Sequence, residues 1–475
     1  MFVPWLGILL VLVVLGGVMI GLKLISARCH LHPETSRKAV HIAMGLVTLS
    51  FPWLFTASWP VLLLAALAIA ALTGTRLIAP LRERFGAVLH GVERHSLGEL
   101  YFPLAVAALY LLSEGNHLLY AIPLLTLTLA DAVAALVGVR YGQHRFSTSE
   151  GTKSAEGSLA FFMVAFLSAH VPLLLLSETG RAESLLIALV LGVLVMLFEA
   201  VSVGGVDNLF IPLGCYALLR RYQTLEADDL LFRLGAIVLL ALLVFAWRRR
   251  TTLKESGLLA AALVGYMNWA LGGWQWLAVS LVLFLTYTLL WPRSEDNDHP
   301  VHTVRAVASV AAPGMIWLLV FLENNRMGSV LEPFTLSYAA HSVMVGMTQL
   351  GYAAPGQMLS KRLMRAVSRT WIVFLPLLFL PVMDNWHADR YRIFLDVSAG
   401  MLWSVIALPL LCVAALLHHR LAGYLGNDEQ GYGRWLRRAI VAIGISFAAW
   451  VLFMICFPVV VKLFGCLNIF SGAAP

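Results

Sequence analysis

The sequence predicts an all-α, polytopic integral membrane protein with about sixteen transmembrane helices. Of its 475 residues, 60% are hydrophobic and only 12% are charged, whereas about 25% of a soluble domain is charged. The mean hydropathy is +0.83. The apolar residues form runs spread over the whole chain, many near the roughly 20 residues that a helix needs to cross a bilayer. These observations exclude a soluble protein built around one core.

The first apolar run, residues 2–25, has no basic residues before it and no small-residue cleavage site, so we interpret it as a retained span. The later predicted spans are 39–56, 59–79, 100–113, 117–139, 156–176, 184–203, 230–247, 257–272, 275–292, 303–322, 334–352, 370–383, 396–417 and 436–464. The segment 208–219 is shorter than a crossing requires, which favours a half-helix or re-entrant segment. The five cysteines form no CxxC pair and are expected to be packing residues.

The basic residues predict the orientation. If the spans alternate from an outside N-terminus, most of the 33 Lys and Arg residues fall in cytoplasmic loops, as the positive-inside rule requires. The net charge of +7 therefore needs no nucleic-acid partner. We expect a multi-pass protein of the cytoplasmic membrane. The basic stretch WRRRTTLKESG at 247–257 predicts two helical units, residues 1–250 and 251–475.

Four polar clusters interrupt the first half on the predicted cytoplasmic side. In SRKAVHIAMG, at 36–45, Arg37, Lys38 and His41 share one helix face. In GELYFPL, at 98–104, Glu99 enters a span. Each of these two clusters could also be an ordinary helix end with a positive-inside anchor or a solvated acid.

The third cluster is DAVAALVGVRYGQHRFSTSEGTKSAEGS, at 131–158. Asp131 stands above a stripe of small residues that includes Gly138 and Gly142, which suits close approach of either another helix or a ligand. Lys153 and Glu156 lie three apart in a Gly- and Ser-rich setting that suits phosphate binding. The Walker A pattern is absent.

The fourth cluster, FEAVSVGGVDNLFIP at 198–212, contains Glu199, Asp207 and Asn208. Carboxylate and amide oxygens are hard ligands that suit Mg²⁺ bound to nucleotide phosphates. Cations, acids and a histidine on one side of a membrane bundle together match the chemistry of phosphoryl transfer.

These clusters, in this order, resemble the phytol kinase and dolichol kinase family of membrane enzymes over residues 30–215. The resemblance implies transfer of the γ-phosphate of CTP, or of another nucleotide, to a lipid alcohol at the cytoplasmic face, with a divalent metal such as Mg²⁺. The acceptor would be a polyprenol, a phytol-like alcohol or diacylglycerol from the bilayer.

The resemblance also implies site residues. The expected catalytic residues are Asp131, Lys153, Glu156 and His41. The expected nucleotide- or phosphate-binding residues are Arg37, Lys38, Gly138, Gly142, Lys153, Ser154, Gly157 and Ser158. The expected metal ligands are Asp131, Glu156, Glu199, Asp207 and Asn208, with Glu99 as a supporting residue. Which acid is the base and which holds the metal stays open.

The second half, from TLKESGLLAAALVGYMNWALGG onwards, resembles the DUF92 family, which includes the plant phytyl-phosphate kinase. At the acidic positions of that family this chain has His341 and Gly346. We therefore expect an inactive unit that packs on the first half or shapes a lipid groove, with a second kinase step as the alternative.

Two other functions remain open from the sequence. A cytidylyltransferase that makes a CDP-lipid would need the same nucleotide and metal apparatus. A transporter or lipid scaffold would also place polar residues near span ends, although no inverted repeat of the kind common in transporters is visible. The oligomeric state and the acceptor are not indicated by the sequence.

Overall fold

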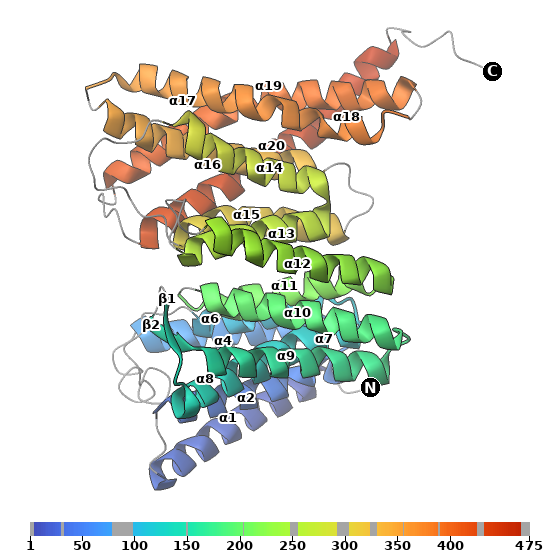
Figure 1. The fold of residues 1–475 in the computed structure, drawn as a ribbon, viewed down its shortest axis with the longest axis vertical. Helices are drawn as coiled ribbons and strands as arrows, with labels where there is room; N and C mark the ends of the chain where they lie inside the picture. The colour runs from blue at the N-terminus through green and yellow to red at the C-terminus, as the bar shows by residue number, and fades with distance from the viewer. Residues whose placement is uncertain are drawn as a thin grey trace, which may run out of the picture. The chain divides into compact units, whose positions relative to one another are not determined.

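The computed structural model describes residues 4–29, 33–77, 98–148, 151–202, 204–247, 255–291, 304–323, 330–354, 356–387, 390–424 and 432–466, and it is helical almost throughout (Figure 1). The chain forms two compact units. Unit 1 is Met1–Arg249 with Leu258–Leu263, and unit 2 is Arg250–Gly257 with Val264–Pro475. The predicted boundary between residues 250 and 251 lies outside the described residues.

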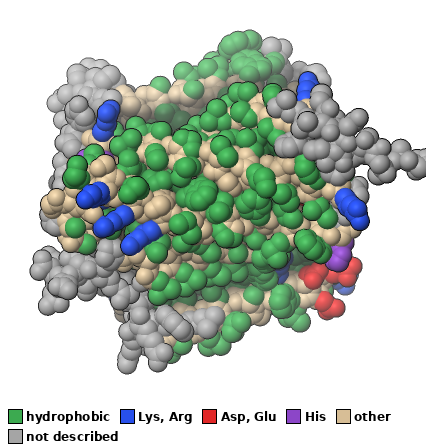
Figure 2. Space-filling view, turned by 90° about the horizontal axis from the view of Figure 1, so that it is seen from above, with side chains coloured by type: hydrophobic (Ala, Val, Ile, Leu, Met, Phe, Trp, Pro, Cys, Tyr) green, Lys and Arg blue, Asp and Glu red, His purple; other side chains and the backbone are tan. Residues whose placement is uncertain are grey.

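Within the described ranges, nine helices are long and apolar enough to cross a membrane, and four shorter apolar helices accompany them. The prediction of an all-α polytopic membrane protein is therefore confirmed. Large hydrophobic side chains stay exposed on these helices, for example Leu176 at 71% and Val405 at 70%. Figure 2 shows one face on which hydrophobic side chains dominate and Lys and Arg lie near the edges. Such a face suits lipid chains rather than water.

The described elements of unit 1 are α1 (Pro4–Cys29), α2 (Pro33–Leu49), α3 (Phe51–Leu54), α4 (Trp59–Leu77), α6 (Gly98–Leu112), α7 (His117–Leu125), η1 (Thr126–Ala130), α8 (Asp131–Tyr141), β1 (Arg145–Thr148), β2 (Gly151–Ser154), α9 (Ala155–Leu176), α10 (Arg181–Val201), α11 (Asp207–Tyr222) and α12 (Ala227–Trp247). The helices α7, η1 and α8 form one continuous span, His117–Tyr141. Asn116 caps its start, because its side chain accepts hydrogen bonds from the backbone N–H groups of Leu118 and Leu119.

Two elements of unit 1 differ from the sequence prediction. The loop after α8 contains an antiparallel hairpin, in which Arg145 pairs with Ser154 and Phe146 with Lys153. The short segment at 208–219 is part of a longer helix, α11, with 16 residues. Most of α11 is buried, which agrees with the expectation that this segment is surrounded by protein.

Helix α13 (Glu255–Gly272) is divided between the units, since its residues Leu258–Leu263 belong to unit 1 and the rest to unit 2. The other described elements of unit 2 are α14 (Trp274–Leu285), η2 (Thr286–Leu290), α15 (Val304–Glu323), α16 (Leu331–Ala353), α17 (Leu359–Phe374), η3 (Leu375–Phe379), α18 (Leu380–Asp384), α19 (Arg390–Tyr424) and α20 (Tyr432–Cys466). The predicted span at 370–383 begins earlier, at Leu359, because the basic segment before it is also helical. There Lys361 and Arg365 are exposed, whereas Ala366 and Thr370 are buried.

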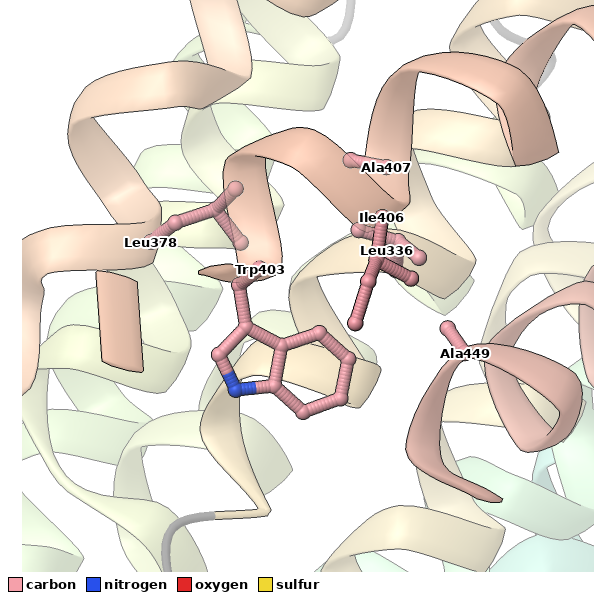
Figure 3. Packing of buried hydrophobic residues seen from close by; sticks show 6 residues of the cluster. All are labelled: Leu336, Leu378, Trp403, Ile406, Ala407 and Ala449. Carbon is pink, nitrogen blue, oxygen red and sulfur yellow. The ribbon is translucent and has the colours of Figure 1, made fainter. Parts of the chain in front are cut away.

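A hydrophobic cluster joins the helices of unit 2 (Figure 3). Its buried members are Leu336 from α16, Leu378 from η3, Trp403, Ile406 and Ala407 from α19, and Ala449 from α20. The indole ring of Trp403 stacks on the ring of Phe453, with the ring centroids 4.5 Å apart. Unit 2 therefore has a packed interior of its own.

Candidate active site

A buried ion pair joins α2 to the first residue of α8. Lys38 Nζ lies 2.6 Å from Asp131 Oδ2, and the two side chains are 5% and 19% exposed. His41 Nε2 lies 3.7 Å from the same oxygen and 3.4 Å from the backbone carbonyl of Leu127. Lys38 and His41 are three residues apart and share one face of α2. Arg37, by contrast, is exposed.

A close helix approach makes this pair geometrically feasible. One turn after His41, α2 carries Gly45, and a Cβ atom at that position would lie 2.2 Å from the side chain of Thr128. Thr128 belongs to η1, a π-helical turn directly before Asp131. Such turns recur at functional sites, where they redirect the helix that follows. The glycine and the π-helical turn thus bring Asp131 within reach of Lys38 and His41.

A second ion pair joins β2 to the end of α10. Lys153 Nζ lies 2.6 Å from Glu199 Oε1, and it also donates to the backbone carbonyl of Glu199. The two side chains are 26% and 14% exposed. Glu199 lies in the last turn of α10, whose carbonyl groups carry partial negative charge and favour a cation.

The charges of both ion pairs act on the carboxyl group of Asp207. Its Oδ1 atom is buried and has no hydrogen-bond partner, while its backbone N–H donates to Ser202 Oγ over 3.2 Å. The charged side chains that act on its carboxyl group are Asp131, Lys153, Lys38 and Glu199. The pKa of Asp207 is raised to about 6, first by burial and then by the neighbouring negative charges, against the effect of the lysines. A carboxylate oxygen without a partner in this setting suits a cation.

Asn208 and Glu99 lie at a neighbouring helix junction. The side-chain amide of Asn208 donates to the backbone carbonyl of Gly98 over 3.0 Å, which ties the start of α11 to the start of α6. Glu99 follows Gly98 in the first turn of α6. Asn208 therefore fixes the position of Asp207, its neighbour in sequence.

Glu156 has a different partner from the other acids. Its Oε1 atom accepts from the backbone N–H of His144 over 3.1 Å and lies 2.7 Å from His144 Nδ1. The imidazole is 82% exposed and the carboxylate 28% exposed. This pair ties the start of the hairpin to the first turn of α9, whereas the acids that act on Asp207 are Asp131 and Glu199.

The small residues around the hairpin pack α8 against α9. A Cβ atom at Gly142 would lie 2.8 Å from Ser154 Oγ, and one at Gly157 would lie 3.0 Å from the carbonyl oxygen of Ala134. Ser154 Oγ also accepts from the backbone N–H of Gly157 over 3.1 Å and so caps α9. Gly138 meets the same serine, at 3.2 Å. Helix packing thus accounts for the small size of these glycines and of Ser154. Their role in phosphate binding stays a prediction, as does that of the half-buried Ser158.

The donor set has the character expected for a hard divalent cation. In the part of the chain that the structure describes, no three His, Cys, Asp or Glu side chains are grouped as a metal site. Asp131 and Glu199 each hold a lysine, and the free oxygen of Asp207 lies within the field of both. The residues fit a magnesium ion if the lysines turn to another anion, such as a phosphate.

Some residues that position the site are not indicated by the sequence pattern. Gly45 and Thr128 set the approach of α2, Ser202 holds the start of α11, and His144 holds Glu156. The sequence does offer a signal for Gly45, because this residue lies four positions after His41 and therefore on the same helix face. Ser202 and His144 had none, because loop contacts leave no periodic pattern.

The comparisons with known proteins concern the first half of the chain. A curated protein named phytol kinase, from Synechocystis sp., is 34% identical over 218 residues. The alignment covers 44% of this chain and 88% of that protein. No family model matches the chain, and no solved structure matches it. The resemblance of the second half to another family therefore stays a prediction.

Proposed function

Because this chain belongs to the phytol kinase family, we propose that it is a membrane lipid-alcohol kinase that transfers the γ-phosphate of CTP, or of another nucleoside triphosphate, to a phytol-like or polyprenyl alcohol or diacylglycerol. The observation that supports this most is the two lysine–acid pairs, Lys38–Asp131 with His41 beside it and Lys153–Glu199, whose charges both act on the buried carboxyl group of Asp207. Such a set can bind phosphates and a cation and can also accept a proton.

In the proposed reaction, the bond between the γ-phosphorus and its bridging oxygen breaks, and a bond to the oxygen of the alcohol forms. Lys153 and Lys38 turn from their acids to the phosphate oxygens and stabilise the charge of the transition state. His41 or Asp131 accepts the hydroxyl proton, and the nucleoside diphosphate leaves. A bound Mg²⁺, held by Asp207 with Asp131 or Glu199, would neutralise the phosphate charge.

The acceptor would reach the site from the bilayer. The helices of unit 1 expose large apolar side chains, such as Leu136 at 36% and Leu159 at 57% on α8 and α9. Leu136 lies five residues after Asp131 on α8, and Leu159 lies three residues after Glu156 on α9. Sideways entry would let the alcohol keep its hydrophobic tail in lipid while the hydroxyl group reaches the ion pairs. In this proposal the site faces the cytoplasm, where nucleotides are supplied.

The test is a reconstituted assay. Purified protein in lipid nanodiscs receives a nucleoside triphosphate, Mg²⁺ and a panel of lipid alcohols, and the products are analysed for lipid phosphate and released nucleotide. We expect a phosphorylated alcohol and a nucleoside diphosphate, both abolished in Asp131→Ala and Lys153→Ala. In a parallel reaction that offers a lipid phosphate as the acceptor, release of pyrophosphate with a CDP-lipid would instead identify a cytidylyltransferase. Absence of any product with every nucleotide would refute the proposal.

We further propose that unit 2 does not catalyse a second phosphoryl transfer. Gly346 packs under the ring of Trp291, since a Cβ atom there would lie 2.4 Å from the indole. His341 is buried at 2% exposure. Neither residue supplies a carboxylate for a metal ion. The assay should therefore yield lipid monophosphate and no diphosphate.

A further inference from the structure

The β-hairpin places an aromatic ring beside a lysine of the site. Its register pairs Phe146 directly with Lys153. Residues that face each other in an antiparallel pair project from the same side of the ribbon, with their Cβ atoms about 4.5–5.5 Å apart. Phe146 and Lys153 therefore share one face of the hairpin.

That face is turned toward α10. Lys153 Nζ reaches both the carboxylate and the backbone carbonyl of Glu199 in the last turn of that helix. The other face is turned toward α8, because Ser154 on it lies against Gly138 and Gly142. These two sets of contacts place Phe146 on the same side of the hairpin as Lys153 and its partner Glu199.

The base of the hairpin is tied down. The backbone N–H of Ala155 donates to the carbonyl of His144 over 2.9 Å, and the side chain of His144 pairs with Glu156 at 2.7 Å. Phe146 is nevertheless 39% exposed. A large aromatic side chain that is carried by an anchored hairpin and left open next to the proposed phosphate-binding Lys153 has a face available for a planar ligand.

We propose that Phe146 is the platform on which the base of the nucleoside triphosphate stacks while its phosphates lie at Lys153. This inference rests on the proposed kinase function and adds a base subsite to it. Because every nucleobase has a π-face, stacking supplies affinity for the nucleotide without choosing among bases. Phe146 thus determines how tightly nucleotides bind, and other groups must select the base.

The experiment measures binding of a non-hydrolysable nucleoside triphosphate to the full-length protein in nanodiscs, together with steady-state kinetics. Phe146→Ala should raise the Kd and the nucleotide KM about 10-fold, with kcat and the KM for the alcohol unchanged. Phe146→Trp should bind like the wild type. Phe146→Leu is the matched control, because it keeps an apolar side chain and removes the aromatic face, and it should behave like Phe146→Ala.

Thr152→Ala changes an exposed position on the other face of the same hairpin and should leave nucleotide binding unchanged. If Phe146→Leu binds nucleotide as tightly as the wild type, the ring serves only as an apolar contact, and the stacking proposal is wrong while the kinase function stands. If the wild-type protein binds no nucleoside triphosphate with or without Mg²⁺, the proposed function and this inference both fail.

Discussion

At Asp131, one carboxylate oxygen serves two partners, with Lys38 at 2.6 Å and His41 at 3.7 Å. Removing charges from water is costly, and a buried pair is retained only when its geometry and its further contacts offset that cost. In a membrane bundle, such a residue is by default a functional one. Substitution of Lys38 should therefore leave the charge of Asp131 uncompensated.

Lys38→Met tests the pairing, because methionine keeps much of the bulk and removes the charge. We expect the folded protein to lose about 3 kcal/mol of stability, since the buried carboxylate loses its cation, and kinase activity to fall more than about 100-fold. Thermal unfolding in detergent and the nanodisc assay measure the two effects. Arg37→Ala, at the exposed neighbouring position, should change stability little.

The double variant Lys38→Met, Asp131→Asn separates stability from chemistry. Removing both charges should restore most of the lost stability, because no uncompensated charge remains. Activity should stay absent. Recovery of activity in the double variant would show that this pair only holds the helices together.

Asp207→Asn should stabilise the metal-free protein and abolish activity. The pKa of this carboxyl group lies at about 6 in the folded state against an ordinary value of 3.8, so the folded protein holds the proton more tightly than the unfolded chain. Ionisation therefore costs stability, increasingly as the pH rises from 3.8 to about 6 and fully above it. At pH near 8 in EDTA we expect a gain of about 1–3 kcal/mol, which should shrink toward pH 4.

Unfolding curves of the Asp207→Asn variant and the wild type at both pH values measure this effect. A variant that is less stable than the wild type at high pH would contradict the prediction. Activity of the variant near the wild-type level would exclude Asp207 from the metal site.

The residues of the site could be found from sequence because acids and lysines stand out in apolar spans. The side chains that these residues contact could not be found from sequence. Lys38 and Asp131 are 93 residues apart, and no local pattern states which cation meets which acid. Glu156 shows the same limit, because the sequence does not indicate that its carboxylate contacts the exposed His144; its role as a metal ligand stays a prediction.

At the scale of elements, the close approach of α2 to η1 determines where Lys38 and His41 lie relative to Asp131. The contact leaves no room for a Cβ atom at Gly45, because the side chain of Thr128 lies 2.2 Å from its position. The position of the α2 face that carries Lys38 and His41 therefore depends on how closely α2 packs against η1.

Gly45→Ala should therefore separate the two helices. We expect a destabilisation of about 1–3 kcal/mol, typical of overpacking, and a loss of activity larger than this loss of stability alone explains. Gly16→Ala in α1, where a Cβ atom would meet no atom within 4 Å, is the matched control. Thermal unfolding and kinase assays of both variants, and of Gly45→Ala with Thr128→Gly as a rescue, provide the measurement.

Helix positions followed closely from the apolar runs, since each span must satisfy its own backbone hydrogen bonds in lipid. The exceptions share a physical reason. The strands β1 and β2 have four residues each and are set by pairing with each other rather than by composition. The start of α17 lies before the predicted span 370–383 because its charges lower the local hydropathy, although Lys and Arg on a helix can extend their head groups to the membrane surface.

At the scale of the whole molecule, the charged residues predict how unit 1 is oriented in the membrane. Helix α9 has the hairpin at one end and the loop with Glu178 at the other. The basic residues predict that the hairpin faces the cytoplasm and the Glu178 loop faces outside.

Single cysteines test this prediction in a chain whose native cysteines are replaced. With a membrane-impermeant maleimide on intact cells, Glu178→Cys should be labelled, and Gln143→Cys, at an exposed position before the hairpin, should react only after the cells are opened. The reverse pattern would invert the topology of unit 1 and place the candidate site outside.

The two lysine–acid pairs have a consequence for the order of events during turnover. Each pair is internally neutral, because the ammonium group of the lysine offsets the charge of its carboxylate. A nucleotide alone would take the lysines and leave two carboxylates bare, and a divalent cation alone would displace two ammonium groups into a confined space. Under the proposed function, we therefore expect nucleotide and Mg²⁺ each to bind more tightly when the other is present.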